Sequence, residues 1–384
     1  MTRPISQRPS GLVRDVRIWD LPTRLFHWSL VAAVATAGAT GFLGDASLLS
    51  VHTVAGYSTA GLVIFRLVWG VFGSTYSRFG LMLRMLADLP AHCRSILRLK
   101  PLHYVGHNPA GSLMIFGLLL VLMALSASGL ILEGGQEKQG LLAGVTPYWA
   151  GRLAREPHEL LAYALALMVA GHIAGVLFES VLLRVPLIRG MITGWLPVPT
   201  TLLPATPLHG PNLWLAVPVL TVVTAGGAYA LAPLALMAPL GVPAGPVNQV
   251  YTSECGACHE AYHPSLLPRA AWARLIASLD DHFGEDASLT PVKTVEVAAY
   301  LDANAAEAWD TEPANVFRQL SGREPMRASR SPFWERRHAH LPDAIFATTD
   351  IKSRSHCSAC HHDAAAGRFA DQQIWIPESA EGAL

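Results

Sequence analysis

Five long apolar segments constrain the fold of this 384-residue chain more than any other feature. A helix needs about 20 predominantly apolar residues to cross the hydrocarbon core of a bilayer. The segments that approach this length are residues 25–43, 53–73, 111–132, 158–181 and 213–240. We therefore predict five transmembrane helices. The first apolar stretch is longer than that of a cleaved signal peptide, so we expect it to be retained as an anchor.

The composition changes near the segment Gly241-Val-Pro-Ala-Gly-Pro246. Almost all of the long uncharged stretches precede residue 241, and most of the acidic residues follow it. We therefore expect a membrane domain at residues 1–200, a linker with the fifth membrane helix at 201–245, and a polar domain at 246–384. The formal net charge of zero argues against a nucleic-acid partner.

Two pentads in the polar domain consume four of the five cysteines: Cys255-Gly-Ala-Cys258-His259 and Cys357-Ser-Ala-Cys360-His361. Each has the C-x-x-C-H pattern of a c-type haem attachment site, in which two thiols bond the macrocycle and the histidine ligates its iron. The alternatives for a C-x-x-C pair are a redox dithiol and half of a zinc site, and the histidine that follows directly counts against both. Haem c is attached outside the bacterial cytoplasm, so we expect this domain to be periplasmic.

The short loops predict the same orientation. Lys and Arg accumulate on the cytoplasmic side of membrane proteins. Ten such residues precede the first helix or lie between the second and third: Arg3, Arg8, Arg14, Arg17, Arg24, Arg78, Arg84, Arg94, Arg98 and Lys100. The loop between the first and second helices has none. The N-terminus is therefore expected in the cytoplasm, and five crossings place residues after 240 in the periplasm.

Four histidines in the apolar part are candidate ligands of b-type haem, because ionisable side chains inside a membrane usually mark function. His158 and His172 lie on one predicted helix, on nearly the same face and about 21 Å apart along its axis. The topology places His52 level with His158, and His27 nearer the depth of His172. We expect two non-covalent haems b, ligated by His52 with His158 and by His27 with His172. The alternative is that some of these histidines only cap helices or pair at interfaces.

The distal ligands of the two haems c are narrowed by elimination. Met326 is the one methionine after residue 246, so at most one of these haems has a His/Met ligand pair. His282 is far enough along the chain to fold over the haem of His259, and His338 or His340 over that of His361. A crossed arrangement is sterically possible, so the pairing stays open at this point. His263 follows its own pentad by only four residues and is expected to be a surface side chain.

The membrane part resembles the bacterial cytochrome b561 and nickel-hydrogenase cytochrome b family over about residues 15–196. Five segments carry the likeness: Trp19-Asp-Leu-Pro-Thr-Arg-Leu-Phe-His27-Trp28, Phe65-Arg-Leu-Val-Trp-Gly70, Gly106-His-Asn-Pro109, His172-Ile-Ala-Gly175 and Met191-Ile-Thr-Gly194. The resemblance implies a four-helix bundle with two bis-histidine haems b that exchanges electrons with the quinone pool. In place of the His-Arg-Glu-Asn segment of hydrogenase-type members, this chain has Leu183-Arg-Val-Pro-Leu187.

The polar domain resembles the dihaem cytochrome c family called DHC over about residues 246–384. The segments that carry this likeness are Glu254-Cys-Gly-Ala-Cys-His-Glu-Ala-Tyr262, Leu266-Leu-Pro268, Asp281-His-Phe-Gly284, Cys357-Ser-Ala-Cys-His361 and Gly367-Arg-Phe369. The resemblance implies a bis-histidine electron carrier with His282 and His338 as distal ligands. Some relatives pass electrons to a small oxygen-binding monohaem cytochrome c.

The predicted fold is all-α: a transmembrane four-helix haem b bundle, a fifth transmembrane helix and a small, mainly α dihaem cytochrome c domain. The predicted function is electron transfer in the bacterial inner membrane, between quinone or quinol and a periplasmic c-type cytochrome or other small haem protein, with possible quinol:cytochrome c oxidoreductase activity. The alternatives are a membrane anchor that reduces quinone with electrons from a periplasmic oxidoreductase, and a haem-based sensor that binds a small ligand. Arg66 is a candidate partner of a haem propionate, and its alternative role is snorkelling to the interface.

Overall fold

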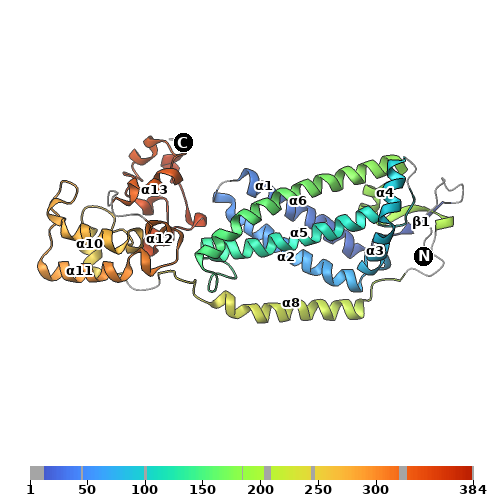
Figure 1. Ribbon diagram of the computed structural model, residues 1–384, viewed down its shortest axis with the longest axis horizontal. Coiled ribbons are helices and arrows are strands. Elements are labelled where there is room, and N and C mark those ends of the chain that lie inside the picture. Colours follow the sequence, from blue (N-terminus) through green and yellow to red (C-terminus); the bar gives the residue numbers. More distant parts are fainter. Residues whose placement is uncertain are drawn as a thin grey trace. The chain divides into compact units, whose positions relative to one another are not determined.

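The computed structural model describes residues 13–44, 46–98, 102–183, 185–202, 209–243, 247–319 and 327–382. Within them the regular structure is helical apart from one short pair of strands (Figure 1). The predicted all-α fold is therefore confirmed.

Five helices are long and apolar enough to cross a membrane, as predicted. They are α1 (Leu21–Leu43), α2 (Leu49–Phe72), α5 (Pro109–Leu132), α6 (Tyr148–Leu183) and α8 (Leu213–Leu236). Helix α6 begins at Tyr148 rather than near residue 158, because its charged first turns continue the helix through Pro157. Hydropathy alone finds only the apolar portion of such a helix.

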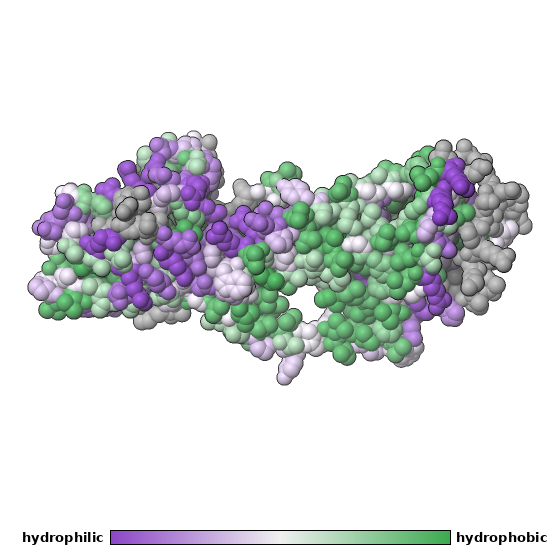
Figure 2. Space-filling model, viewed as in Figure 1, coloured by the Kyte–Doolittle hydropathy of each residue, from purple (hydrophilic) through white to green (hydrophobic). Residues whose placement is uncertain are grey.

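Helices α1, α2, α5 and α6 run side by side (Figure 1). Their contact is a core of Val63, Leu119, Leu122 and Leu165, against which side chains of α1 such as Leu30 also pack. The outward side chains of these helices are apolar as well, and Figure 2 shows hydrophobic residues covering them. A helix that is apolar on all sides is suited to lipid rather than to water.

Helix α1 begins where its sequence supplies a cap. Asp20 accepts a hydrogen bond from the Thr23 backbone N–H at 2.8 Å, and Pro22 occupies the first turn. The other oxygen of Asp20 accepts from the Trp69 indole N–H of α2 at 3.1 Å. The cap of one helix therefore also fixes the end of its neighbour.

A two-stranded antiparallel sheet lies next to the start of α1. Strand β1 (Val13–Arg17) pairs antiparallel with β2 (Trp195–Pro199), with Val13 opposite Pro199 and Arg17 opposite Trp195. Prolines are tolerated in β2 because each strand of so small a sheet has a free edge. The sequence analysis did not predict this pairing of β2 with the N-terminal strand. Short helices α3 (Phe79–Met85) and α4 (Leu89–Leu97), joined by η3 (Leu86–Asp88), lie between α2 and α5 in the chain, and α7 (Leu187–Thr193) precedes β2.

The chain divides into two compact units. One contains Met1–Gly44, Ser50–Gly129 and Glu156–Ala232. The other contains Asp45–Leu49, Leu130–Arg155 and Pro233–Leu384. The segment that joins α5 to α6 therefore packs with the C-terminal residues. It includes the π-helical turn η4 (Glu133–Glu137).

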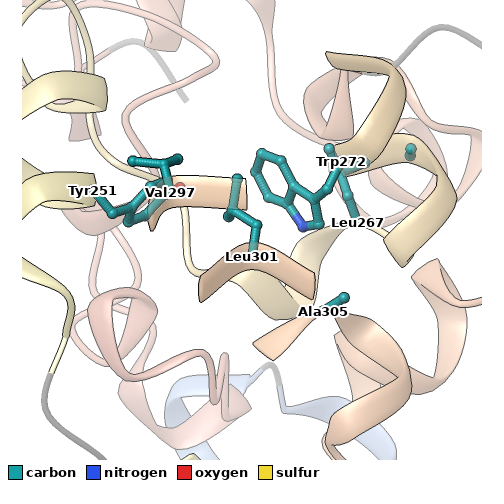
Figure 3. Packing of buried hydrophobic residues seen from close by; sticks show 7 residues of the cluster. Tyr251, Leu267, Trp272, Val297, Leu301 and Ala305 are labelled. Carbon is teal, nitrogen blue, oxygen red and sulfur yellow. The ribbon is translucent and has the colours of Figure 1, made fainter. Parts of the chain in front are cut away.

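The second unit consists of short helices and turns. Its α-helices are α9 (Gln249–Cys255), α10 (Arg269–Ala277), α11 (Pro291–Asn304), α12 (Glu312–Phe317), α13 (Pro332–Arg337) and α14 (Glu378–Glu381). Tyr251, Leu267, Trp272, Val297 and Leu301 form its largest core (Figure 3). Two smaller clusters form around Phe317 and around Ile345. Among the described residues, the buried side chains of this unit thus form three separate clusters.

Candidate haem-binding sites

Eight histidines face one another in four pairs, and two of these pairs lie among the membrane helices. His27 of α1 lies opposite His172 of α6, with ring centroids 6.5 Å apart. His52 of α2 lies opposite His158 of α6, with ring centroids 6.2 Å apart. Helix α6 thus contributes one histidine to each pair, as the fourteen-residue spacing predicts for two side chains on one face.

The other two pairs lie in the second unit, each containing the histidine of one pentad. The rings of His259 and His282 are 6.2 Å apart and nearly parallel, with an interplanar angle of 20°. The rings of His338 and His361 are 6.1 Å apart. His340, the other candidate for the second pentad, is exposed. Each pentad histidine therefore lies opposite the distal histidine of the uncrossed arrangement. Met326 lies outside the described residues.

The separation within all four pairs suits an iron atom between two imidazoles. Iron–nitrogen bonds of about 2 Å on each side place the centres of two ligating rings about 6 Å apart. An imidazole pair in direct ring contact would be closer, as Trp334 and His338 are at 4.1 Å. Each pair therefore leaves room for one metal ion and is too wide for a direct hydrogen bond along the line between the rings.

Hydrogen bonds at Nδ1 leave Nε2 free in four of the eight rings. The acceptors are backbone carbonyls for three of them: Ala37 O for His52 at 2.9 Å, Glu260 O for His259 at 2.7 Å and Trp334 O for His338 at 2.8 Å. His158 Nδ1 lies 3.0 Å from Ser128 Oγ. Donation from Nδ1 fixes the tautomer whose Nε2 lone pair can bind a metal. The donor sets therefore fit haem iron.

Two of the paired histidines have a buried nitrogen without a hydrogen-bond partner. The Nδ1 atoms of His27 and His361 are buried and make no hydrogen bond within the described residues. The same is true of His92 and His103, which belong to none of the four pairs, so this feature does not by itself identify a haem ligand.

Glycines make room for the second membrane pair. A Cβ atom at Gly41 of α1 would approach His52 Cε1 to 3.0 Å, and one at Gly129 of α5 would approach His158 Cε1 to 3.2 Å. These glycines let the two imidazoles lie against neighbouring helices. Neither glycine was predicted from the sequence. Each lies at the same depth as a candidate ligand, which the helical register of the sequence could have indicated.

None of the four pentad cysteines forms a disulfide bond. Cys255 is the last residue of α9, and Cys357 begins the turn η11 (Cys357–Ala359). Burial raises the pKa of Cys255 to about 11 and that of Cys357 to about 12, with further increases from Glu254 and Glu260 respectively. In the polypeptide alone both thiols are therefore protonated at neutral pH.

The candidate propionate partner Arg66 is buried, with 4% of its surface exposed. Its Nη1 donates to the Ser77 carbonyl at 2.9 Å, and its guanidinium lies 4.7 Å from the centre of the Phe79 ring. A snorkelling side chain would reach water, so burial disfavours that alternative. The contact with a propionate stays a prediction.

Two further histidines have structural roles in the polypeptide. His263 is not the surface side chain expected from the sequence: its Nδ1 accepts from the Ser265 N–H at 3.2 Å and caps the turn η6 (Pro264–Leu266). His107 packs against Trp19, with ring centroids 4.5 Å apart. Burial, with a smaller contribution from Arg66, lowers the pKa of His107 to about 3. Both rings are therefore neutral at physiological pH.

Comparison with known proteins divides the chain in the same way as its motifs. The family described as prokaryotic cytochrome b561 matches residues 18–194, and the family described as dihaem cytochrome c matches residues 251–369. The chain therefore resembles a different family over each of these two regions. It joins a region similar to cytochrome b561 to a region similar to dihaem cytochrome c in one polypeptide.

Individual relatives match one region each. A probable Ni/Fe-hydrogenase B-type cytochrome subunit of Azotobacter vinelandii is 25% identical over 216 residues, which cover 47% of this chain and 88% of that protein. A probable Ni/Fe-hydrogenase 1 B-type cytochrome subunit of Escherichia coli K12 is 23% identical over 226 residues, covering 49% and 94%. The solved dihaem cytochrome c of Rhodobacter sphaeroides is 37% identical and covers 32% of this chain and 97% of its own, with a TM-score of 0.28.

The matches to both families support a membrane-embedded electron-transfer haem protein with haem b and haem c as cofactor types. The family and the five apolar helices make it a multi-pass membrane protein. These two statements confirm the coarse function predicted from the sequence.

Proposed function

We propose that the chain moves electrons between the quinone pool and a periplasmic redox partner through two haems b and two haems c. The observation that carries this proposal is the set of four histidine pairs, whose ring centroids are 6.1–6.5 Å apart. When bound, haem iron supplies a one-electron change between its ferric and ferrous states. The paired histidines would hold the iron.

Each proposed role is assigned to named side chains. His27 with His172 and His52 with His158 hold the two haems b. His259 with His282 and His361 with His338 hold the two haems c, which are bonded covalently to Cys255, Cys258, Cys357 and Cys360. Because every pair offers an imidazole to both faces of the iron, no open coordination position is expected. This arrangement disfavours a sensor that binds a small ligand.

The proposed location is the bacterial inner membrane, with a cytoplasmic N-terminus and a periplasmic dihaem region. The distribution of Lys and Arg supports this orientation, as does the requirement that haem c be attached outside the cytoplasm. The quinone enters as the lipid-soluble substrate of the b561 region.

A second direction of electron flow has its own support. The relatives of the membrane region include proteins named as hydrogenase B-type cytochrome subunits. By analogy, a periplasmic oxidoreductase would deliver electrons to the dihaem region, and the chain would reduce quinone. The same histidines would hold the same haems, and only the order of the potentials would differ.

Anaerobic addition of a quinol to the oxidised, purified protein tests the proposal. The α-bands of haem b and haem c should both appear, and addition of an oxidised periplasmic c-type cytochrome should bleach both. If a reduced periplasmic donor reduces the haems and only added quinone reoxidises them, electrons flow in the second direction. If quinol reduces neither type of haem, the proposed function is wrong.

A further inference from the structure

The segment between α5 and α6 makes an ion pair with the C-terminal residues of the same compact unit. Lys138 is almost completely buried, with 4% of its surface exposed. Its ammonium group donates to Asp310 Oδ2 at 2.7 Å and to the Thr146 carbonyl at 3.1 Å. A buried charge is tolerated only when it is well paired, so this contact requires both partners in place.

Asp310 also forms hydrogen bonds with the first residue of α6 and with Gly241, which follows α8 in the chain. The same Oδ2 accepts from the Tyr148 backbone N–H at 2.8 Å, at the first turn of α6. Its Oδ1 accepts from the Asn315 side chain at 3.1 Å, and its own N–H donates to the Gly241 carbonyl at 2.7 Å. These donors hold the pKa of Asp310 below its usual value despite its partial burial. The carboxylate therefore stays ionised at neutral pH.

A second contact of this segment leads to the His338–His361 pair. Glu137, 8% exposed, accepts from the Asp371 backbone N–H at 3.2 Å. The Asp371 side chain pairs with Arg337 at 2.8 Å, and Arg337 directly precedes His338. Arg337 also lies 3.6 Å from Glu312. The His338 side of the pair is therefore connected to Glu137 through Asp371 and Arg337.

The other side of the pair is connected through the backbone. Asp371 begins the turn η13 (Asp371–Gln373). The Gln373 carbonyl accepts from the His362 N–H at 3.1 Å, and the Trp375 N–H donates to the Cys360 carbonyl at 2.8 Å. The pentad and its distal histidine are thus both held by elements that contact the segment.

The His259–His282 pair is connected to the second pentad through the residue next to His259. Glu260, next to His259, accepts from the Ser358 backbone N–H at 3.1 Å, and Ser358 lies inside the second pentad. His259 and Cys258 are exposed, as is the Phe283 ring beside His282. The first pentad therefore contacts the second on one side and presents its own histidine to solvent.

We propose that residues 133–148, here called the strap, make His338–His361 the electron-entry site of the dihaem region and leave His259–His282 as the site facing the soluble partner. Glu137 and Lys138 are positioning residues. Glu137 holds η13 through the Asp371 N–H, and Lys138 holds Asp310, two residues before Glu312, which lies 3.6 Å from Arg337 of α13. This inference rests on the proposed function. It adds the order of the two c-type sites and the residues that set it.

Replacement of Lys138 by Met tests the proposal, with Lys293→Met as the matched control. Lys293 forms an equally short ion pair with Glu254 at 2.7 Å, beside the first pentad instead of the second. After rapid reduction of haem b by quinol, the first phase of haem c reduction should be at least tenfold slower in Lys138→Met and unchanged in Lys293→Met. Asp310→Asn, which keeps an acceptor for the Tyr148 N–H, should give the same slowing with less disturbance of folding.

Hydrogen exchange supplies a readout independent of electron transfer. In Lys138→Met the amides of residues 337–347 and 371–375 should exchange faster, while those of residues 249–285 should not. Faster exchange in the first stretch with an unchanged first phase would overturn the proposal, as would equal slowing by Lys293→Met. Failure of quinol to reduce any haem in the wild-type protein would instead refute the proposed function.

Discussion

The hydrogen bonds at Nδ1 distinguish the paired histidines at the scale of single residues. His158 is held by Ser128, whereas His27 and His361 have no hydrogen-bond partner at Nδ1 within the described residues. A ring held at Nδ1 keeps its orientation without iron, and a ring without such a bond depends on the iron. Loss of a ligand should therefore affect the two membrane pairs separately.

Replacement of His172 by Ala should remove one haem b and leave both haems c attached. The pair with His27 would lose one axial ligand, while His52 and His158 remain 6.2 Å apart. Pyridine haemochrome quantification of the purified variant measures both haem types. His103→Ala, outside all four pairs, is the control and should keep the full complement. A full complement of haem b in His172→Ala would contradict the proposed pairing.

His263 should make the dihaem region sensitive to acid. Burial lowers the pKa of His263 from 6.5 to about 4. Between these values the unfolded chain binds more protons than the folded one, so stability falls as the pH falls through this window. The loss amounts to at most about 3 kcal/mol.

The variant His263→Asn tests this origin of the sensitivity, because asparagine also caps a turn but does not titrate. Denaturant unfolding followed at pH 7.5 and pH 4.5 should show a smaller difference in the variant than in the wild-type protein. An unchanged difference would assign the sensitivity to other groups.

At the scale of elements, the spacing of glycines and histidines along the helices sets the haem b sites. Gly129 of α5 lies against His158, and Gly38 of α1 has open space where a Cβ would be. Gly129→Val should displace the His158 ring and lower the content or shift the potential of one haem b.

The control for this prediction is Gly38→Val, which adds the same side chain to α1 without a neighbour within 4 Å of its Cβ. The haem b spectrum and its redox titration are the measurements. Equal effects of the two variants would show that helix propensity, rather than contact with His158, is responsible.

The elements themselves were largely predictable from the sequence. Apolar length located α1, α2, α5, α6 and α8. The first turns of α6 and the short helices α12 and α13 were not predicted. Their helical form depends on caps such as Thr311 and Ser331 and on tertiary packing, which periodicity does not report.

The candidate sites were predictable to the extent that chain order and topology constrain them. The pentads, and the shared face of His158 and His172, follow from spacing. The choice between His338 and His340 does not, because they are only two residues apart and both precede the pentad by a similar distance. The strap contacts were not predicted, since Lys138 and Asp310 are 172 residues apart and their pairing requires the folded unit.

At the scale of the whole molecule, the chain joins regions that match two haem-protein families, and its proposed orientation decides which side of the membrane the dihaem region faces. A C-terminal alkaline phosphatase fusion should be active and a C-terminal green fluorescent protein fusion dark, because the distribution of Lys and Arg predicts a periplasmic C-terminus. The opposite pair of results would place the dihaem region in the cytoplasm and remove the proposed soluble partner.

A potentiometric titration with pyridine haemochrome quantification on the same sample tests the tetrahaem proposal most directly. We expect two haems b and two haems c per chain, with potentials that rise from the haems b to the haems c if quinol oxidation feeds a periplasmic acceptor. Haems c that are lower in potential than haems b would support electron delivery to quinone instead. Any other stoichiometry would contradict the assignment of four histidine pairs to four haems.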